Sequence, residues 1–181
     1  MIDALITSKT RIKLLSRLFL NSYSKAHLRG LATEFSESSN AIRLELNRFE
    51  KAGLLKANQD GMKKVFHANT DHPLYGDIRS ILMKHLGFDQ IIEKVTHKLG
   101  DVRKVYVTGD YAKGIDSGTI NLLFLGNTID ADYLKSLMAK AEKLISRMIT
   151  YTVCSAEKEE ECRQDTSDED ILLLWEGDFT L

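Results

Sequence analysis

The spacing of apolar residues in the N-terminal part of the chain predicts three helices. Apolar side chains recur at steps of three and four from Ser8 to Asn21, which is typical of an amphipathic helix, and Ser8 or Thr7 suits its N-cap. A shorter segment with the same period covers His27 to Phe35 and ends in a polar turn. A third segment runs from Asn40 to Ala52 and ends at Gly53, a residue that commonly terminates helices.

The third predicted helix has two faces of different character. Ile42, Leu46 and Phe49 lie together on one side and would face a core. The opposite side carries amides and cations, namely Asn40, Arg43, Asn47 and Lys51. Arginine can bind guanine through two hydrogen bonds and asparagine can bind adenine, so we expect Arg43 and the two asparagines to read bases. Ser39 and Lys51 are expected to hold the phosphate backbone.

A short hairpin is predicted directly after this helix. Two strand-like segments, Leu54–Ala57 and Lys63–Ala68, flank the pair Asp60–Gly61, which is a strong hairpin-turn signal. Lys63 and Lys64 would then form a basic tip that can contact phosphates. The series of helix, helix, turn, polar-faced helix and basic hairpin therefore predicts a module that binds double-stranded DNA.

The segment from Ser38 to Leu55 resembles the recognition helix, and the exit from it, of winged helix-turn-helix transcriptional regulators of the ArsR/MarR kind. The resemblance covers about residues 5–70. It implies sequence-specific DNA binding, and we expect a homodimer because one winged helix contacts few base pairs. Cysteine-based metal sensing, which occurs in the ArsR branch, is not supported, because residues 1–72 contain no cysteine.

The second half of the chain alternates between helical and strand-like patterns, which predicts a small α/β domain. A helical pattern from Pro73 to Gly100 is divided at Gly87. The segments that follow are a strand over Val102–Thr108, a strand over Thr119–Leu125, a helix over Asp130–Met148, a strand over Ile149–Cys154 and an apolar segment over Ile171–Trp175 that suits a strand or a helix. The fold class predicted for the whole chain is α+β.

Two neighbouring segments, Val107–Gly114 and Ser117–Gly126, resemble the minimal nucleotidyltransferase family. That family has a Gly-Ser turn that approaches a triphosphate, followed by two carboxylates at alternate positions of a strand that hold Mg²⁺. In this chain the corresponding positions form a degenerate nucleotide site, made of Gly109, Asp110, Lys113, Thr119 and Asn121. Because Thr119 and Asn121 are neutral, we expect this domain to have the family fold without the activity, and the chain not to be an enzyme.

Charge is distributed unevenly over the 181 residues, although the net charge is only −1. Residues 1–72 carry 12 Lys and Arg against 7 Asp and Glu, whereas residues 73–181 carry 13 against 19. This asymmetry favours an anionic partner for the first part. We divide the chain into a winged-helix domain (1–72), linker or dimerisation helices (73–99) and a nucleotidyltransferase-like domain (100–181).

Other features of the sequence narrow the function classes. No apolar run reaches the length of a membrane span, and no secretion signal is visible, so a cytoplasmic location without membrane association is expected. The histidines show no metal-ligand spacing, and no metal or cofactor is implied. The two cysteines are too few for a disulfide scaffold.

The function expected from these patterns is a sequence-specific transcriptional regulator. Its C-terminal domain would sense a nucleotide or another small-molecule effector, or would mediate dimerisation. Two alternatives are a nucleotidyltransferase with atypical metal ligands fused to its own DNA-binding regulator, and a protein-interaction module.

Overall fold

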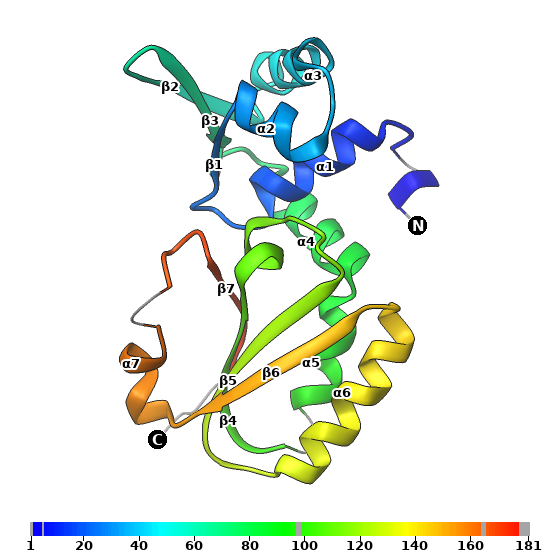
Figure 1. The fold of residues 1–181 in the computed structure, drawn as a ribbon, viewed down its shortest axis with the longest axis vertical. Helices are drawn as coiled ribbons and strands as arrows, with labels where there is room; N and C mark the ends of the chain where they lie inside the picture. The colour runs from blue at the N-terminus through cyan, green and yellow to red at the C-terminus, as the bar shows by residue number, and fades with distance from the viewer. Residues whose placement is uncertain (1, 5, 97–98, 164–165, 178–181) are drawn as a thin grey trace. The chain divides into compact units, whose positions relative to one another are not determined.

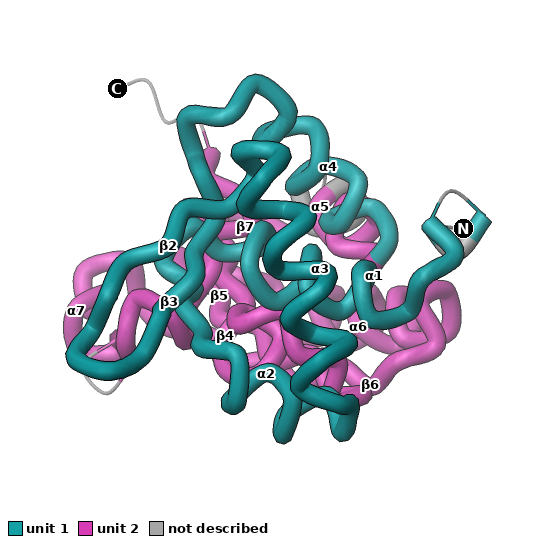
Figure 2. Tube along the Cα trace, turned by 90° about the horizontal axis from the view of Figure 1, so that it is seen from above, with its two compact units in different colours: residues 1–85 teal, residues 86–181 magenta. Residues whose placement is uncertain are grey.

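A computed structural model describes residues 2–4, 6–96, 99–163 and 166–177 of the chain. The chain divides into two compact units, Met1–His85 (unit 1) and Leu86–Leu181 (unit 2), drawn in separate colours in Figure 2. Helices and strands occur in both units (Figure 1), which confirms the predicted α+β class. In the described ranges, no helix is long and apolar enough to cross a bilayer.

Unit 1 combines helices with a small antiparallel sheet in the strand order β1-β3-β2. Its elements are η1 (Ile2–Ala4), α1 (Lys9–Phe19), β1 (Lys25–His27), α2 (Leu28–Phe35), α3 (Ser39–Lys51), β2 (Leu55–Asp60), β3 (Lys63–Ala68) and α4 (Tyr75–Leu86), whose last residue opens unit 2. Strand β1 was not predicted from the sequence. It is three residues long and pairs with β3 far along the chain, so its own residues carry no strand pattern.

Local hydrogen bonds fix where the helices of unit 1 begin and end. The Ser8 hydroxyl accepts from the backbone amide of Arg11, which caps α1 as predicted. The Ser38 hydroxyl accepts from the backbone amide of Ala41, so α3 begins at Ser39, one residue before the predicted start. After α3, Gly53 adopts φ +75°, a left-handed conformation that turns the chain into the hairpin. The turn at Gly53 thus leads from the end of α3 directly into β2 of the hairpin.

Unit 2 is a four-stranded sheet in the order β6-β5-β4-β7, with its two longer helices on one face. Its elements are α5 (Phe88–Thr96), β4 (Gly100–Thr108), η2 (Gly109–Lys113), β5 (Thr119–Ile129), α6 (Ala131–Ile145), β6 (Met148–Cys154), η3 (Ala156–Lys158), α7 (Glu159–Arg163) and β7 (Ile171–Glu176). Strands β5 and β6 are parallel because α6 connects them, and the other pairs are antiparallel. The segment at Ile171–Trp175, whose sequence suited a strand or a helix, forms strand β7.

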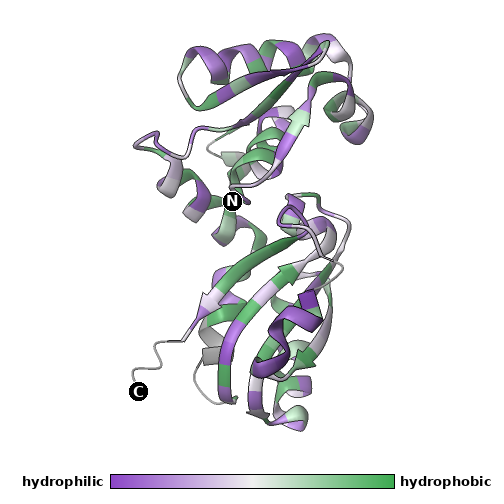
Figure 3. Cartoon of the chain, turned by 90° about the vertical axis from the view of Figure 1, so that its left-hand side faces the viewer, coloured by the Kyte–Doolittle hydropathy of each residue, from purple (hydrophilic) through white to green (hydrophobic). Residues whose placement is uncertain are grey.

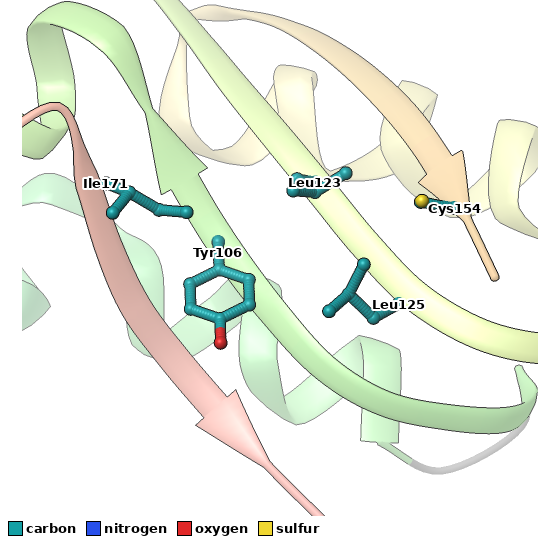
Figure 4. Close-up of a cluster of buried hydrophobic side chains, with 5 residues drawn as sticks. All are labelled: Tyr106, Leu123, Leu125, Cys154 and Ile171. Carbon is teal, nitrogen blue, oxygen red and sulfur yellow. The ribbon is translucent and has the colours of Figure 1, made fainter. Parts of the chain in front are cut away.

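The two faces of the unit 2 sheet differ. Val105 and Val107 are almost fully buried, and by strand alternation they share one face of β4. Tyr106 lies on the opposite, outer face, away from the helices behind the sheet (Figure 4). A buried cluster on the outer face, formed by Tyr106, Leu123, Leu125, Cys154 and Ile171, is drawn in Figure 4. A disulfide between Cys154 and Cys162 ties the hydrophilic helix α7 to this face (Figure 3).

The predicted segment 73–99 is divided between the units. Its first helix, α4, belongs to unit 1 up to His85, and its second, α5, belongs to unit 2. Gly87 separates them at φ +83°, and a Cβ there would lie 2.5 Å from a side-chain carbon of Ile145. Glycine is therefore required at this break both by the backbone conformation and by the space available.

Candidate nucleic-acid interface

A groove of about 770 Å³ lies between the start of α2, the outer side of α3 and the β2–β3 hairpin. The residues that line it are His27, Leu28, Arg29, Arg43, Asn47, Met62, Lys63, Lys64 and Phe66. The structure thus brings together four predicted site residues from two separate elements: Arg43 and Asn47 from α3, and Lys63 and Lys64 from the hairpin. The other predicted residues, Ser39, Asn40 and Lys51, are exposed on α3 but do not line the groove.

The cations of this groove are mostly available to a ligand. Arg29, Arg43 and Lys63 are exposed, and none of them forms an ion pair with a described residue. Lys64 differs, because its ammonium lies 2.7 Å from a carboxylate oxygen of Glu50 and 5.0 Å from the centroid of the Phe66 ring. Three unpaired cations therefore face the groove, and a fourth is held by an internal partner.

The acidic residues of α3 are neutralised internally. Glu45 is largely buried, and its carboxylate accepts hydrogen bonds from Arg11 at 2.9 Å and from Arg48 at 2.7 Å. The hydrogen bond from Arg11 is the main cause of the lowered pKa of Glu45, so this carboxylate stays charged and paired. Glu50 is paired with Lys64. The outer side of α3 is thus left with unpaired positive charge.

Besides the groove residues His27, Leu28 and Phe66, the sequence reasoning missed three residues at this interface. Arg29 reaches the groove from α2, and only the packing of α2 against α3 reveals this. Met62, in the hairpin turn, is fully exposed at 100%. Leu44 is 52% exposed on α3 although it is a large apolar residue. The last two carry a signal that could have been used, because both are apolar residues within predicted polar surface.

In unit 2, the structure brings together only part of the predicted degenerate nucleotide site. Asn121 on β5 pairs in register with Thr108, and its amide nitrogen would lie 3.3 Å from a Cβ placed on Gly109. Its side-chain oxygen accepts a hydrogen bond from the Thr150 hydroxyl at 2.5 Å. Thr119 lies two residues away on the same strand, so Gly109, Thr119 and Asn121 belong to one end of the outer face.

The charged members of that predicted site do not converge on it. Lys113 forms an ion pair with Asp170, just before β7. Asp110 is exposed in η2, and no described residue pairs with it. Among the described residues, no group of three His, Cys, Asp or Glu could hold a metal ion. The side chains gathered at this end of the sheet are therefore amides and hydroxyls rather than charged groups.

A cavity of about 380 Å³ opens on the outer face of unit 2. Its polar lining consists of neutral groups, namely Thr108, Asn121, Thr150, Thr152 and Thr166. Cys162 of the disulfide also contributes to the wall. Hydroxyl and amide groups of this kind can donate and accept hydrogen bonds without adding charge. The cavity is thus suited to an uncharged polar part of a small molecule.

Asp116, beside the predicted site, is bound within the fold. Its carboxylate receives a hydrogen bond from Arg147 at 2.6 Å and another from the hydroxyl of buried Tyr111. Burial raises the pKa of Asp116, but the hydrogen bonds from Arg147 and Tyr111 outweigh this effect and lower it below the ordinary value. Burial, followed by the neighbouring carboxylate, raises the pKa of Tyr111 far above its usual range. These three side chains cross-link the loop after η2 to the residues after α6.

No protein-family model matches the chain, and no curated protein sequence matches it either. Several solved structures are similar in part. Reduced HlyU from Vibrio cholerae is 12% identical over 46% of this chain and 82% of its own, with a TM-score of 0.37. A proposed nucleotidyltransferase from Sulfolobus solfataricus is 18% identical over 55% of this chain and 87% of its own, with a TM-score of 0.38. TrmBL2, an archaeal chromatin protein, is 14% identical over 90% of this chain and 73% of its own, with a TM-score of 0.29.

One expectation from the sequence requires correction. The neutral residues Thr119 and Asn121 led to the expectation that the chain is not an enzyme, and this is wrong as a deduction. A proposed nucleotidyltransferase is among the structures similar to this chain, and the neutral character of Thr119 and Asn121 does not define what the rest of the site can do. No enzyme role is thereby established, and we base the function on the geometry of the chain itself.

Proposed function

We propose that the protein is a sequence-specific transcriptional regulator that binds double-stranded DNA through unit 1. The observation that carries the proposal is the distribution of charge around α3. The acidic residues of that helix are paired within the fold, while Arg43 on its outer side and Lys63 on the hairpin are unpaired and line one groove. Phosphates supply the negative charge that such a surface lacks.

In the proposed complex, α3 enters the major groove. Arg43 and Asn47 line the groove and would bind base edges. Asn40, about one helical turn before Arg43 on α3, would do the same. Ser39 and Lys51 would contact the phosphate backbone near the two ends of α3. Lys63 would contact phosphates from the hairpin, and Lys64 would do so by exchanging its partner Glu50 for a phosphate.

We propose that the protein acts as a homodimer on two half-sites about one helical turn apart, because a single helix and hairpin contact few base pairs. In this proposal unit 2 senses a small effector or holds the dimer together. The neutral polar cavity on its outer face favours the sensing role. Its hydroxyl and amide lining is suited to a nucleobase or to a similarly uncharged polar ring.

The DNA-binding proposal can be tested with a random duplex library that is bound by the purified protein across a salt series and sequenced after retention. We expect a steep loss of binding with salt and an enriched, roughly palindromic motif. Salt-dependent binding without a motif would contradict sequence specificity. An absence of retention even at low salt would contradict DNA binding altogether.

The role of unit 2 can be tested with a panel of nucleotides. Calorimetric titration should give heat with at least one member, and Asn121→Ala should abolish that heat if the outer-face cavity is the binding site. No heat with any member would instead favour a dimerisation role. Transfer of label from ATP in the presence of Mg²⁺ would assign an enzymatic role to unit 2.

A further inference from the structure

Leu44 occupies the middle of the outward side of α3. At about 100° per residue it lies roughly 200° around the helix from buried Ile42, and only about 20° from Lys51. Its neighbours at the next turns are Asn40, four residues before it, and Asn47, three residues after it. Leu44 is therefore surrounded by the side chains proposed to bind DNA, although its own side chain is apolar and 52% exposed.

The surroundings of Leu44 indicate what kind of surface would cover it. Any partner that buries this side chain must also lie against Asn40, Asn47 and the unpaired cations Arg43 and Lys51. An apolar protein surface would leave those groups without partners, which is costly. The major groove of DNA offers phosphates and base acceptors for them, together with one apolar group, the 5-methyl group of thymine.

We propose that Leu44 contacts the 5-methyl group of a thymine and thereby selects a thymine in each half-site. This inference rests on the proposed function and specifies the DNA sequences that it accepts. The thymine would lie between the bases approached by Asn40 and Asn47, because Leu44 lies between these residues on the helix surface. Burying one methyl group is worth about 0.8 kcal/mol, which corresponds to a roughly fourfold change in affinity.

The experiment uses the duplex selected by the full-length protein and a set of copies in which one thymine at a time is replaced by deoxyuridine. This replacement removes the methyl group and leaves the hydrogen-bonding edge of the base unchanged. We expect wild-type affinity to fall about fourfold at one thymine per half-site and to stay constant at the others. Leu44→Ala should bind the thymine duplex about fourfold more weakly, and should not distinguish thymine from deoxyuridine at that position.

Two further variants control for indirect effects. Leu74→Ala removes an equally exposed leucine from unit 1, at 52%, outside α3, and should keep full discrimination against deoxyuridine. Leu44→Met keeps an apolar side chain of similar length and should keep most of the discrimination. The comparison between thymine and deoxyuridine in the wild-type protein needs no variant, so it stands even where Leu44→Ala folds poorly.

The outcomes separate this inference from the proposed function. If wild-type protein binds the selected duplex and tolerates deoxyuridine at every position, the thymine contact is wrong while DNA binding stands. Discrimination that persists in Leu44→Ala would assign the methyl contact to another residue and would also contradict the inference. If no duplex is bound at all, both the inference and the proposed function are wrong.

Discussion

The outer side of α3 with its hairpin in unit 1 and the outer face of the sheet in unit 2 both expose polar side chains, yet they use their charges differently. On the unit 1 surface, Arg43 and Lys63 have no ionic partner among the described residues. On the unit 2 surface, Lys104 lies 3.0 Å from a carboxylate oxygen of Glu159. In the adjoining turn η2, Lys113 is paired with Asp170. The ability of a surface to bind an anionic partner is therefore indicated less by how many cations it carries than by how many of them lack an ion pair.

This difference follows from what each surface does within its own fold. In unit 2 the ion pairs fasten short elements, such as α7 and the turn at η2, to the sheet, and the cations are thereby used for stability. In unit 1 the hydrophobic side of α3 already holds the helix in place through Ile42 and Leu46. Arg43 and Lys51 on its outer side are exposed and form no ion pair with a described residue.

The largest effect is expected from reversing two cations on the unit 1 surface, with two exposed cations of α6 in unit 2 reversed as a control. Arg43→Glu combined with Lys63→Glu should weaken binding to the selected duplex by more than about 100-fold, because two proposed DNA contacts become repulsive. The matched control, Lys135→Glu with Lys140→Glu on exposed positions of α6, should change affinity by less than about twofold. Fluorescence anisotropy at one fixed salt concentration measures both. Equal losses would show that only the total charge matters.

The sequence predicts the helices and strands of these surfaces better than it predicts which of their charged side chains form ion pairs. The first three helices of unit 1 were located to within about two residues because their apolar residues are periodic, and Ser8 and Gly53 marked ends that the structure confirms. The helix predicted over Asp130–Met148 ends three residues earlier, at Ile145. The partner of Lys64 could not be predicted, because Glu50 lies 14 residues away and meets it only when the hairpin folds against α3. Arg29 was missed for the same reason, since its proximity to the groove depends on tertiary packing.

The next test concerns the disulfide that ties α7 to the unit 2 sheet. Cys154 and Cys162 are eight residues apart, and closing a loop of that length stabilises a fold by about 2–3 kcal/mol. A reductant should lower the thermal unfolding midpoint of unit 2 and increase hydrogen exchange in α7, while affinity for DNA should stay within about twofold.

Cys154→Ser with Cys162→Ser provides the control for the reductant. This variant should unfold earlier than the oxidised wild type and should not respond to reductant. A large change in DNA affinity on reduction of the wild type would contradict the expected independence of the two surfaces. It would show that the outer face of unit 2 is coupled to the DNA-binding surface.

A smaller effect is expected at the cross-link of Arg147, Asp116 and Tyr111. Arg147→Met should lower the free energy of unfolding of unit 2 by about 1–2 kcal/mol at pH 7, a value reduced by the partial exposure of Asp116. Since the folded-state pKa of Asp116 is lowered, its contribution is complete above its unfolded pKa of about 3.9 and is lost as the pH falls through the folded value.

The difference between wild type and Arg147→Met should therefore shrink below about pH 4. Denaturant unfolding of both proteins between pH 7 and pH 3 measures this. A difference that stays constant with pH would assign the effect to packing, since Arg147 also lies 6.0 Å from the centroid of the Tyr111 ring.

The smallest expected effect compares a paired and an unpaired lysine within the proposed DNA interface. Lys51 is exposed and unpaired among the described residues, so Lys51→Ala should weaken binding to all sequences equally and reduce the salt slope by about 1. Lys64 must first leave Glu50, 2.7 Å away, and each phosphate contact it makes leaves that carboxylate without a partner. Lys64→Ala should therefore change the slope by clearly less than Lys51→Ala does. If the two slopes change equally, the pairing seen in the free protein does not govern DNA binding, and the contrast between the two surfaces loses its energetic basis.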